Sequence, residues 1–348
     1  MFYLTYRPKT LSELDNSNVS DTLKNILHAP EVPHALLFVG QKGTGKTSTA
    51  RIFAKAVNCL QNKFSGVGES YEPCNTCSNC ISIEASSSPD VTELDAASNR
   101  GIEEVKKLIH ESAFAPISGK FRVFIIDEAH MITHDAFNAL LKTLEEPPAS
   151  VIFILATTNE EKVPSTIQSR CHRISFGKAK KEDVISMLRR IMRAEHITAP
   201  DDFLEVIATH SDKSFRDATK LLEELVVQNK LTAIEAREYI GVRTKESLIE
   251  VLGTQPLKDA LQWSNEFSKT GGSIKRLIEE LLEELRLVLL SKNGVAVDDV
   301  LATPLTVPQV SVLMKLLNEA YGLLKSSPIE AIPLEIALVE FYNYKNRQ

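Results

Sequence analysis

Short runs of apolar residues, separated by segments with helical spacing, organise the first half of the chain. The runs occupy positions 35–39, 91–94, 123–126, 151–156 and 172–176. Their nearly continuous apolar character is typical of strands buried on both faces of a parallel sheet. Amphipathic segments such as 102–112 and 135–146 lie between them. The pattern therefore predicts an α/β doubly wound domain with a five-stranded parallel sheet.

From about residue 178 onward, apolar residues recur only at helical spacing. The segments 181–194, 201–211, 214–228 and 232–240 predict one small helical domain. Further helices follow, and segment 273–291 carries a broad apolar stripe that favours ordinary core packing over an oligomer interface. We therefore divide the chain into residues 1–178, with a cysteine-containing insert at about 59–80, residues 179–242 and residues 243–348.

Composition limits the classes of protein to consider. The 348 residues carry a net charge of -6 and are 43% hydrophobic, as expected for a globular protein of two or three domains. A chain of this charge is not a basic nucleic-acid coat, so any contact with DNA must come from local patches. The N-terminus lacks the apolar segment of a signal peptide, and the apolar runs are too short to span a membrane, which favours a cytosolic protein.

The segment from Gly40 to Thr47 has the pattern of a phosphate-binding loop, GQKGTGKT, between a strand-like run and a helical segment. Its glycines allow the backbone to wrap a phosphate chain with the N–H groups turned inward. Lys46 would reach the β and γ phosphates, and the Thr47 hydroxyl would bind Mg²⁺. A glycine-rich turn without a ligand is the alternative. The candidate nucleotide-binding residues are Gly40, Gly43, Thr44, Gly45, Lys46, Thr47 and Ser48.

Polar residues follow two of the other apolar runs. Asp127 and Glu128 come directly after 123–126, where Asp127 would hold Mg²⁺ and Glu128 would orient and polarise the attacking water. Thr158 follows 151–156 and could reach the γ phosphate or that water, although without the other motifs strand-end capping would be the preferred explanation. Because parallel strands present their carboxyl ends at one edge, we expect these residues beside the phosphate loop.

Two arginines lie near segment boundaries and suit phosphate recognition, because the guanidinium donates two parallel hydrogen bonds and stays charged. They are Arg170 in the sequence SRC and Arg216 in the sequence SFRD. Taken singly, each is better explained as a solvated or salt-bridged arginine.

Four of the five cysteines are gathered in one polar segment, which favours a metal site over disulfides in a reducing compartment. Cys74, Cys77 and Cys80 follow a C-x-x-C-x-x-C pattern, and Cys59 lies upstream as the fourth candidate ligand. Four thiolates suit a structural Zn²⁺ site. An iron–sulfur motif would continue with a cysteine where Glu84 stands. Free thiols remain a further alternative.

Together these residues resemble the bacterial DNA polymerase III gamma/tau subunits, the clamp-loader motors of the AAA+ superfamily. The resemblance runs from Tyr6 to about Val242, and its order and spacing are more specific than any one motif. The motifs are the phosphate loop with the cysteine insert after it, DAASNRG at 95–101, DEAH at 127–130, LKTLEEPP at 141–148 and SRC at 169–171.

The resemblance implies roles for individual residues. Thr158 would sense the γ phosphate, Arg216 would contact nucleotide in the same subunit from a helical lid, and Arg170 would be the arginine finger offered to a neighbouring subunit. Arg7, Pro8 and Val19 would line the adenine pocket. These roles are added to the list of nucleotide-site residues given above.

The resemblance also implies a fold, an activity and partners. An AAA+ P-loop NTPase domain with a five-stranded parallel sheet would be followed by a helical lid and an all-α collar. For residues 243–348 the resemblance therefore favours an oligomerisation domain over ordinary core packing alone. The chain would bind and hydrolyse ATP, with Mg²⁺ and Zn²⁺ as further cofactors, to load the sliding clamp onto primed DNA. Its partners would be the other subunits of a hetero-pentamer, the clamp and primer-template DNA, with the polymerase core and single-strand-binding protein reached through companion subunits. The expected location is the cytoplasm, at the nucleoid.

Three features depart from the family pattern. Fourteen residues separate Cys59 from Cys74, a longer span than expected, and Ala129 stands where valine is common. The chain stops at Gln348, without the long extension of the tau form, so it would be a short gamma-like form or a truncated tau.

Two other functions were considered. A nucleotide-locked scaffold with little turnover is the main alternative, against which the presence of both Asp127 and Glu128 argues. A DEAH-box helicase is excluded because that class needs a second RecA-like core, and the second half of the chain has no strand-like runs.

Overall fold

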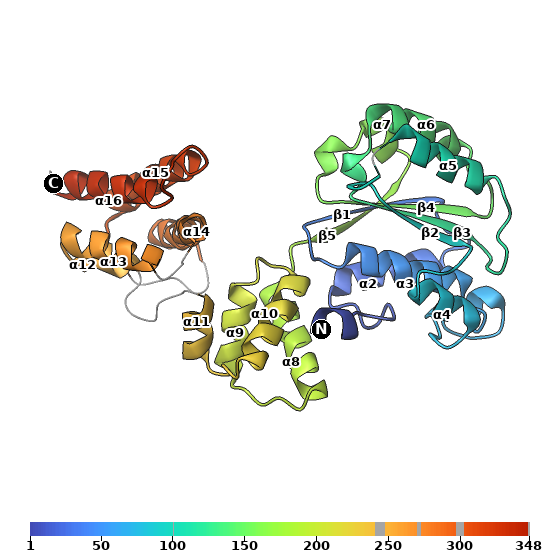
Figure 1. Cartoon of the computed structure of the whole chain (residues 1–348), viewed down its shortest axis with the longest axis horizontal. Helices are drawn as coiled ribbons and strands as arrows, with labels where there is room; N and C mark the ends of the chain where they lie inside the picture. Colours follow the sequence, from blue (N-terminus) through green and yellow to red (C-terminus); the bar gives the residue numbers. More distant parts are fainter. Residues whose placement is uncertain (100, 241–247, 270–272, 297–302, 347–348) are drawn as a thin grey trace. The chain divides into compact units, whose positions relative to one another are not determined.

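The computed structural model describes residues 1–99, 101–240, 248–269, 273–296 and 303–346 (Figure 1). The chain forms two compact units, Met1–Leu231 and Thr232–Gln348, which are described separately below. Arg100 of the DAASNRG motif and the expected boundary at residue 242 lie outside the described residues.

A five-stranded sheet with the order β2-β3-β4-β1-β5 forms the centre of the first unit, and every neighbouring pair is parallel. The strands are β1 (Ala35–Gly40), β2 (Val91–Asp95), β3 (Arg122–Asp127), β4 (Val151–Thr157) and β5 (His172–Gly177). All residues of β4 are buried, which explains its unbroken apolar run, whereas buried and exposed residues alternate at the end of the edge strand β5. The predicted α/β fold with a five-stranded parallel sheet is confirmed.

Helices cover both faces of this sheet (Figure 1). One face carries α2 (Ser17–His28), α3 (Lys46–Asn58) and α4 (Ser78–Glu84), and the other carries α5 (Ile102–Ser112), α6 (His134–Glu145) and α7 (Ser165–Gln168). Each face has its own apolar core. Phe38 and Phe53 are buried on the α3 side, and the rings of Phe124 and Phe153 stack at 5.2 Å on the α6 side. Single 3-10 turns occur at Lys63–Ser65 (η1), Ala129–Met131 (η2) and Glu160–Lys162 (η3).

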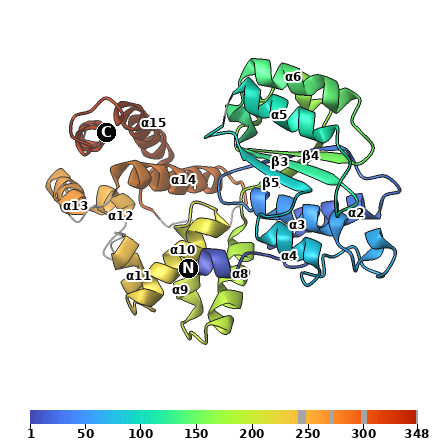
Figure 2. The same ribbon diagram turned by 45° about the vertical axis from the view of Figure 1, so that its right-hand side comes forward.

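The first unit also contains a group of helices after the sheet. These are α8 (Lys181–Ala194), α9 (Asp201–Thr209) and α10 (Phe215–Val227), and they coincide closely with the predicted segments. The short helix α1 (Phe2–Thr5) packs against α10, so the first residues of the chain lie beside this group (Figure 2).

The described part of the second unit is helical. It contains α11 (Ala233–Ile240), α12 (Leu248–Thr254), α13 (Leu257–Lys269), α14 (Ile274–Lys292), α15 (Val307–Leu323) and α16 (Ile332–Lys345). The stripe on α14 includes Leu277, Ile278, Leu281 and Leu285, which are buried in the core of this unit. Core packing thus accounts for the stripe. Across the described residues, no helix has the length and apolar character needed to cross a membrane.

Candidate nucleotide site and cysteine cluster

The loop between β1 and α3 has the backbone geometry of a phosphate cradle. Gly43 and Gly45 have φ values of +78° and +94°, in the left-handed region that side chains rarely adopt. Lys46, the first residue of α3, donates hydrogen bonds from Nζ to the carbonyl oxygens of Gly40 and Gln41, both at 2.8 Å. These hydrogen bonds hold the Lys46 ammonium group over the loop, where it could bind an anion.

Burial and the nearby carboxylates shift the pKa of Lys46 in opposite directions. Burial lowers the pKa of the Lys46 ammonium group, while the carboxylates of Glu128 and Asp127 oppose that shift. The phosphate loop and the end of β3 thus interact electrostatically, as expected for carboxyl ends of strands at one edge of the sheet.

A direct contact joins the phosphate loop to β3. The Thr47 hydroxyl donates a hydrogen bond to Asp127 Oδ2 at 2.6 Å, and Asp127 Oδ1 accepts one from the Glu128 N–H at 2.9 Å. A hydroxyl and a carboxylate are oxygen ligands of the kind that Mg²⁺ prefers, usually with water completing the octahedron. The pair Thr47 and Asp127 therefore fits the predicted magnesium site.

Glu128 has an unusual backbone conformation, with a φ of +47° that is rare for a residue with a side chain. Its Oε2 accepts a hydrogen bond from the Thr158 hydroxyl at 3.2 Å and lies 3.5 Å from His130 Nδ1. Thr158 follows β4, so the predicted sensor and the predicted water-orienting residue contact each other. Strained backbone of this kind is frequent at functional sites.

A cavity of about 310 Å³ opens beside the loop, wholly within the first unit. Its lining includes the predicted residues Arg7, Pro8, Val19, Gly43, Thr44, Gly45, Lys46, Thr47, Ser48, Asp127, Glu128 and Arg216. The Arg216 backbone N–H donates to the Gly43 carbonyl at 3.4 Å, so α10 begins against the phosphate loop. Burial lowers the pKa of Arg7, and the neighbouring charges of Arg51 and Arg216 add to that shift. The cavity is therefore rich in positive charge, as a nucleotide phosphate chain requires.

Some lining residues were missed by the sequence reasoning. Tyr3, Tyr6, Asn16, Arg51 and Phe215 line the same cavity. The cluster of aromatic residues at 2–6 is the one signal in the sequence that could have indicated an apolar surface for a base.

Three predicted residues, Gly40, Thr158 and Arg170, do not line this cavity, and Thr158 reaches the site through its hydrogen bond to Glu128. Gly40 contributes its carbonyl oxygen to Lys46, as described above. Arg170, just after α7, forms an ion pair with Glu145 and donates from Nη1 to the Thr166 carbonyl at 2.7 Å. This is the salt-bridged state that the sequence alone also allowed, and it places Arg170 away from the cavity of its own chain.

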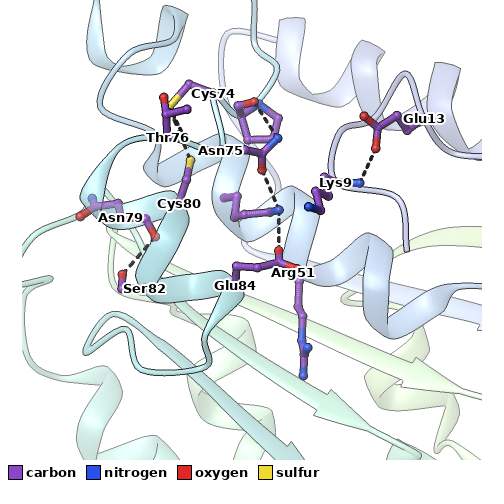
Figure 3. A network of polar contacts seen from close by, with 12 residues as sticks. Lys9, Glu13, Arg51, Cys74, Asn75, Thr76, Asn79, Cys80, Ser82 and Glu84 are labelled. Carbon is purple, nitrogen blue, oxygen red and sulfur yellow. Dashed lines mark hydrogen bonds and ion pairs between the residues drawn. The ribbon is translucent and has the colours of Figure 1, made fainter. Parts of the chain in front are cut away.

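The predicted cysteine ligands converge. The sulfur atoms of Cys59, Cys74, Cys77 and Cys80 all lie within 4.8 Å of one another, and Cys59, Cys77 and Cys80 are buried (Figure 3 shows Cys74 and Cys80). Backbone N–H groups point at these sulfurs, for instance from Cys77 to Cys74 at 3.2 Å. Four converging thiols with such donors fit a tetrahedral zinc site, and Cys59 belongs to it despite the long spacer.

Hydrogen bonds favour the thiolate at one of these positions. Burial alone would raise the pKa of Cys74, but hydrogen bonds from Thr76 and from the Cys77 N–H outweigh it and lower the pKa to about 6. A deprotonated sulfur is the form that binds metal.

A buried lysine of α3 connects this helix to the cysteine loop, and its two partners, Asn75 and Glu84, are labelled in Figure 3. Lys55, of which 1% is exposed, donates to Asn75 Oδ1 at 2.9 Å and to Glu84 Oε2 at 2.8 Å. Asn75 lies between two of the cysteines with a φ of +57°, and Glu84 ends α4. The residue that stands in place of an iron–sulfur cysteine is thus a partner of Lys55.

Comparison with known families adds a further observation. Residues 15–180 match the family model described as DNA polymerase III, delta subunit. The DNA polymerase III subunit tau of Bacillus subtilis (strain 168) is 39% identical over 310 residues, covering 86% of this chain and 53% of that protein. The subunit gamma of Buchnera aphidicola subsp. Baizongia pistaciae is 34% identical over 293 residues, covering 82% of this chain and 78% of that protein. The chain belongs to the DNA polymerase III gamma/tau family.

Members of the gamma/tau family differ in length. The chain spans about half of the Bacillus subtilis relative, and its match covers 41% of the gamma/tau subunit of Mycobacterium tuberculosis (strain ATCC 25618 / H37Rv), at 38% identity. Among solved structures, it is similar to the RuvB Holliday junction branch migration motor of Thermotoga maritima, with 18% identity, a TM-score of 0.49, and coverage of 84% of this chain and 86% of that one.

Proposed function

We propose that this chain is an ATP-driven motor subunit of a DNA polymerase III clamp loader, which binds and hydrolyses ATP to load a sliding clamp onto primed DNA. The observation that carries the proposal is the 2.6 Å contact between Thr47 and Asp127, with Glu128 next to it. It brings the phosphate loop and a candidate hydrolytic carboxylate to one edge of the sheet. Membership of the gamma/tau family supports the assignment to a clamp loader.

The residues divide the work of phosphoryl transfer to water. Lys46 neutralises charge on the phosphates, while Thr47 and Asp127 hold Mg²⁺, which supplies further neutralisation when bound. Glu128 orients the attacking water, and its contact with Thr158 relates this orientation to the state of the γ phosphate. Arg7, Pro8 and Val19 form the side of the cavity that accepts the base.

The two arginines act on different nucleotides in this proposal. Arg216 lines the cavity and reaches nucleotide bound by its own chain. Arg170 acts on nucleotide of a neighbouring subunit, where it stabilises charge that develops on the transferred phosphoryl group. Its ion pair with Glu145 must then open on assembly. Arg170→Ala should leave ATP binding by the isolated chain intact and depress turnover in the assembled loader.

The substitution Glu128→Gln tests the motor assignment. It keeps the size of the side chain and removes the carboxylate, so DNA-stimulated ATP turnover of the reconstituted loader should fall about 100-fold. The dissociation constant for ATP should change less than threefold. Glu103→Gln, at an exposed position on α5, is the matched control. Unchanged turnover in Glu128→Gln would refute the motor role and favour the nucleotide-locked scaffold.

We further propose that the cysteine cluster binds one structural Zn²⁺. The convergence of four sulfurs supports a closed tetrahedral site. Elemental analysis of the purified protein should find about one Zn²⁺ per chain. A brown protein with iron–sulfur absorbance, or a metal-free protein of full stability, would contradict this.

The partners and location follow from the same assignment. In this proposal residues 179–242 form the lid, residues 243–348 form the collar of a hetero-pentamer, and the assembly works in the cytoplasm at the nucleoid. Clamp and primer-template DNA are its substrates. Co-purification with the other loader subunits and the clamp should yield a stable complex, and recovery of the chain alone at micromolar concentration would count against it.

A further inference from the structure

An aromatic ring lies beside the Arg216 guanidinium at the candidate nucleotide site. The centroid of the Tyr3 ring is 5.3 Å from Arg216 Cζ and 5.5 Å from Lys220 Nζ. Both distances are within the range of cation–π attraction. Tyr3 and Arg216 line the same cavity, so the contact belongs to the site.

The position of this ring is fixed by contacts with helices that follow the sheet. The Phe2 N–H donates to Glu223 Oε2 on α10 at 3.1 Å, and the Tyr6 hydroxyl donates to Glu195 Oε1, just after α8, at 2.5 Å. The rings of Phe2 and Tyr6 meet edge to face at 5.8 Å. Contacts on either side of Tyr3, at Phe2 and Tyr6, therefore fix α1 beside α10 and the end of α8. Figure 2 shows the N-terminus of the chain beside these helices.

The charges of the cavity explain why Arg216 needs such a partner. Arg7, Lys46, Arg51 and Arg216 line it together with the carboxylates of Asp127 and Glu128, and Arg51 is paired with Glu93. The charge of Arg216 lowers the pKa of Arg7, so these two guanidinium groups repel each other. The negative face of an aromatic ring offsets this repulsion without adding a carboxylate that would compete with phosphate.

We propose that Tyr3 is a positioning residue for nucleotide binding, whose ring holds the Arg216 guanidinium beside the phosphate loop. This rests on the proposed function, because it presupposes that the cavity takes ATP. The Arg216 backbone already contacts Gly43, so a guanidinium held by Tyr3 stays within reach of the phosphates. The ring performs this function, and the Tyr3 hydroxyl is dispensable.

A double-mutant cycle on the full chain tests the proposal, with Mg·ATP affinity measured by calorimetric titration. Tyr3→Leu should weaken ATP binding about fivefold, as expected for loss of one partly desolvated cation–π contact. Tyr3→Phe should retain wild-type affinity within twofold. In an Arg216→Met background, Tyr3→Leu should cause no further loss, because the group that it positions is gone.

The controls separate the possible failures. Tyr321→Leu removes another cation–aromatic pair, with Lys275 at 6.0 Å in the second unit, and should leave ATP affinity unchanged. An equal loss by Tyr3→Leu in both backgrounds, or a loss by Tyr3→Phe as large as that of Tyr3→Leu, would overturn the role of Tyr3 alone. If the unmodified chain binds no ATP, the proposed function and the role of Tyr3 both fail.

Discussion

Gly43 occupies the tightest position of the phosphate loop, and its replacement by alanine makes a demanding test of the geometry. A Cβ atom added there would lie 2.0 Å from Ser214 Oγ and 3.1 Å from Ser214 Cβ. Ser214 is the N-cap of α10, where its hydroxyl accepts a hydrogen bond from the Asp217 N–H at 3.2 Å. The side chain of Ser214 can avoid the new methyl group only by giving up this cap.

The expected cost has two parts. A side chain at a φ of +78° costs about 1–2 kcal/mol, because Cβ approaches the following carbonyl oxygen. Loss of the serine cap adds about 1 kcal/mol. The total of about 2–3 kcal/mol should lower the melting temperature of the first unit by about 5–10 °C.

Gly66 provides a matched control for the first part. It has a φ of +76°, and an added Cβ would meet nothing within 4 Å. Gly66→Ala should therefore lower the melting temperature by only about half as much as Gly43→Ala, in scanning calorimetry without nucleotide. Ser214→Ala should cost about 1 kcal/mol alone and close to nothing in the Gly43→Ala background. Equal shifts for the two glycine variants, or additivity with Ser214→Ala, would refute this reasoning.

Two further substitutions test the buried hydrogen bonds of the cysteine loop and of the loop that precedes β3. Lys55→Met should weaken zinc affinity by about tenfold in competition with a chromophoric chelator, because Asn75 loses its buried donor, while Lys106→Met on the exposed face of α5 should have no effect. Asp90→Asn should cost about 3 kcal/mol, since its buried carboxylate accepts hydrogen bonds from the backbone N–H groups of residues 117–119 at 2.6–2.7 Å. These hydrogen bonds outweigh the effect of burial and lower the pKa of Asp90 below 3.8. The contribution of its carboxylate to the stability of the fold is therefore present above pH 3.8 and is lost as the pH falls through the pKa of the folded state. In urea titrations, the difference in unfolding free energy between wild type and Asp90→Asn should accordingly stay constant from pH 8 to about pH 5 and become smaller only in stronger acid. A difference that grows on acidification would contradict this explanation.

The sequence predicted elements best where a single feature, such as regular apolar spacing, determines the local structure. Helix α5 was predicted at its observed bounds because its apolar residues recur regularly and it lies between two clear strand runs. Helix α4 was missed, since it lies in the polar segment that holds the cysteines, where no helix was predicted. Its N-cap is Cys77, whose sulfur accepts the Cys80 N–H, and a thiol is not among the usual capping groups. Helix α1 has only four residues and depends on contacts with α10, which no local pattern can indicate.

The same distinction applies to the site. The phosphate loop, Asp127 and Glu128 could be predicted because all strands of a parallel sheet present their carboxyl ends at one edge. Tyr3 and Ser214 could not, since Tyr3 lines the cavity only when α1 packs against α10, and Ser214 approaches Gly43 only when α10 begins beside the loop. Nothing in the local sequence of either residue indicates this packing.

Helix α3 relates the two candidate ligand sites to each other. It begins with Lys46 in the phosphate loop and its C-cap is Cys59, so a helix of about 20 Å separates the two sites. Between its ends, Arg51 pairs with Glu93 on β2 at 2.6 Å, and Lys55 pairs with Glu84. The hydrogen bonds that Lys55 donates to Asn75 and Glu84 are thus made from the last turn of α3, at the end remote from the cavity. A metal bound there can fix the far end of the helix that carries Lys46 but cannot touch a nucleotide, which is why we assign it a structural role.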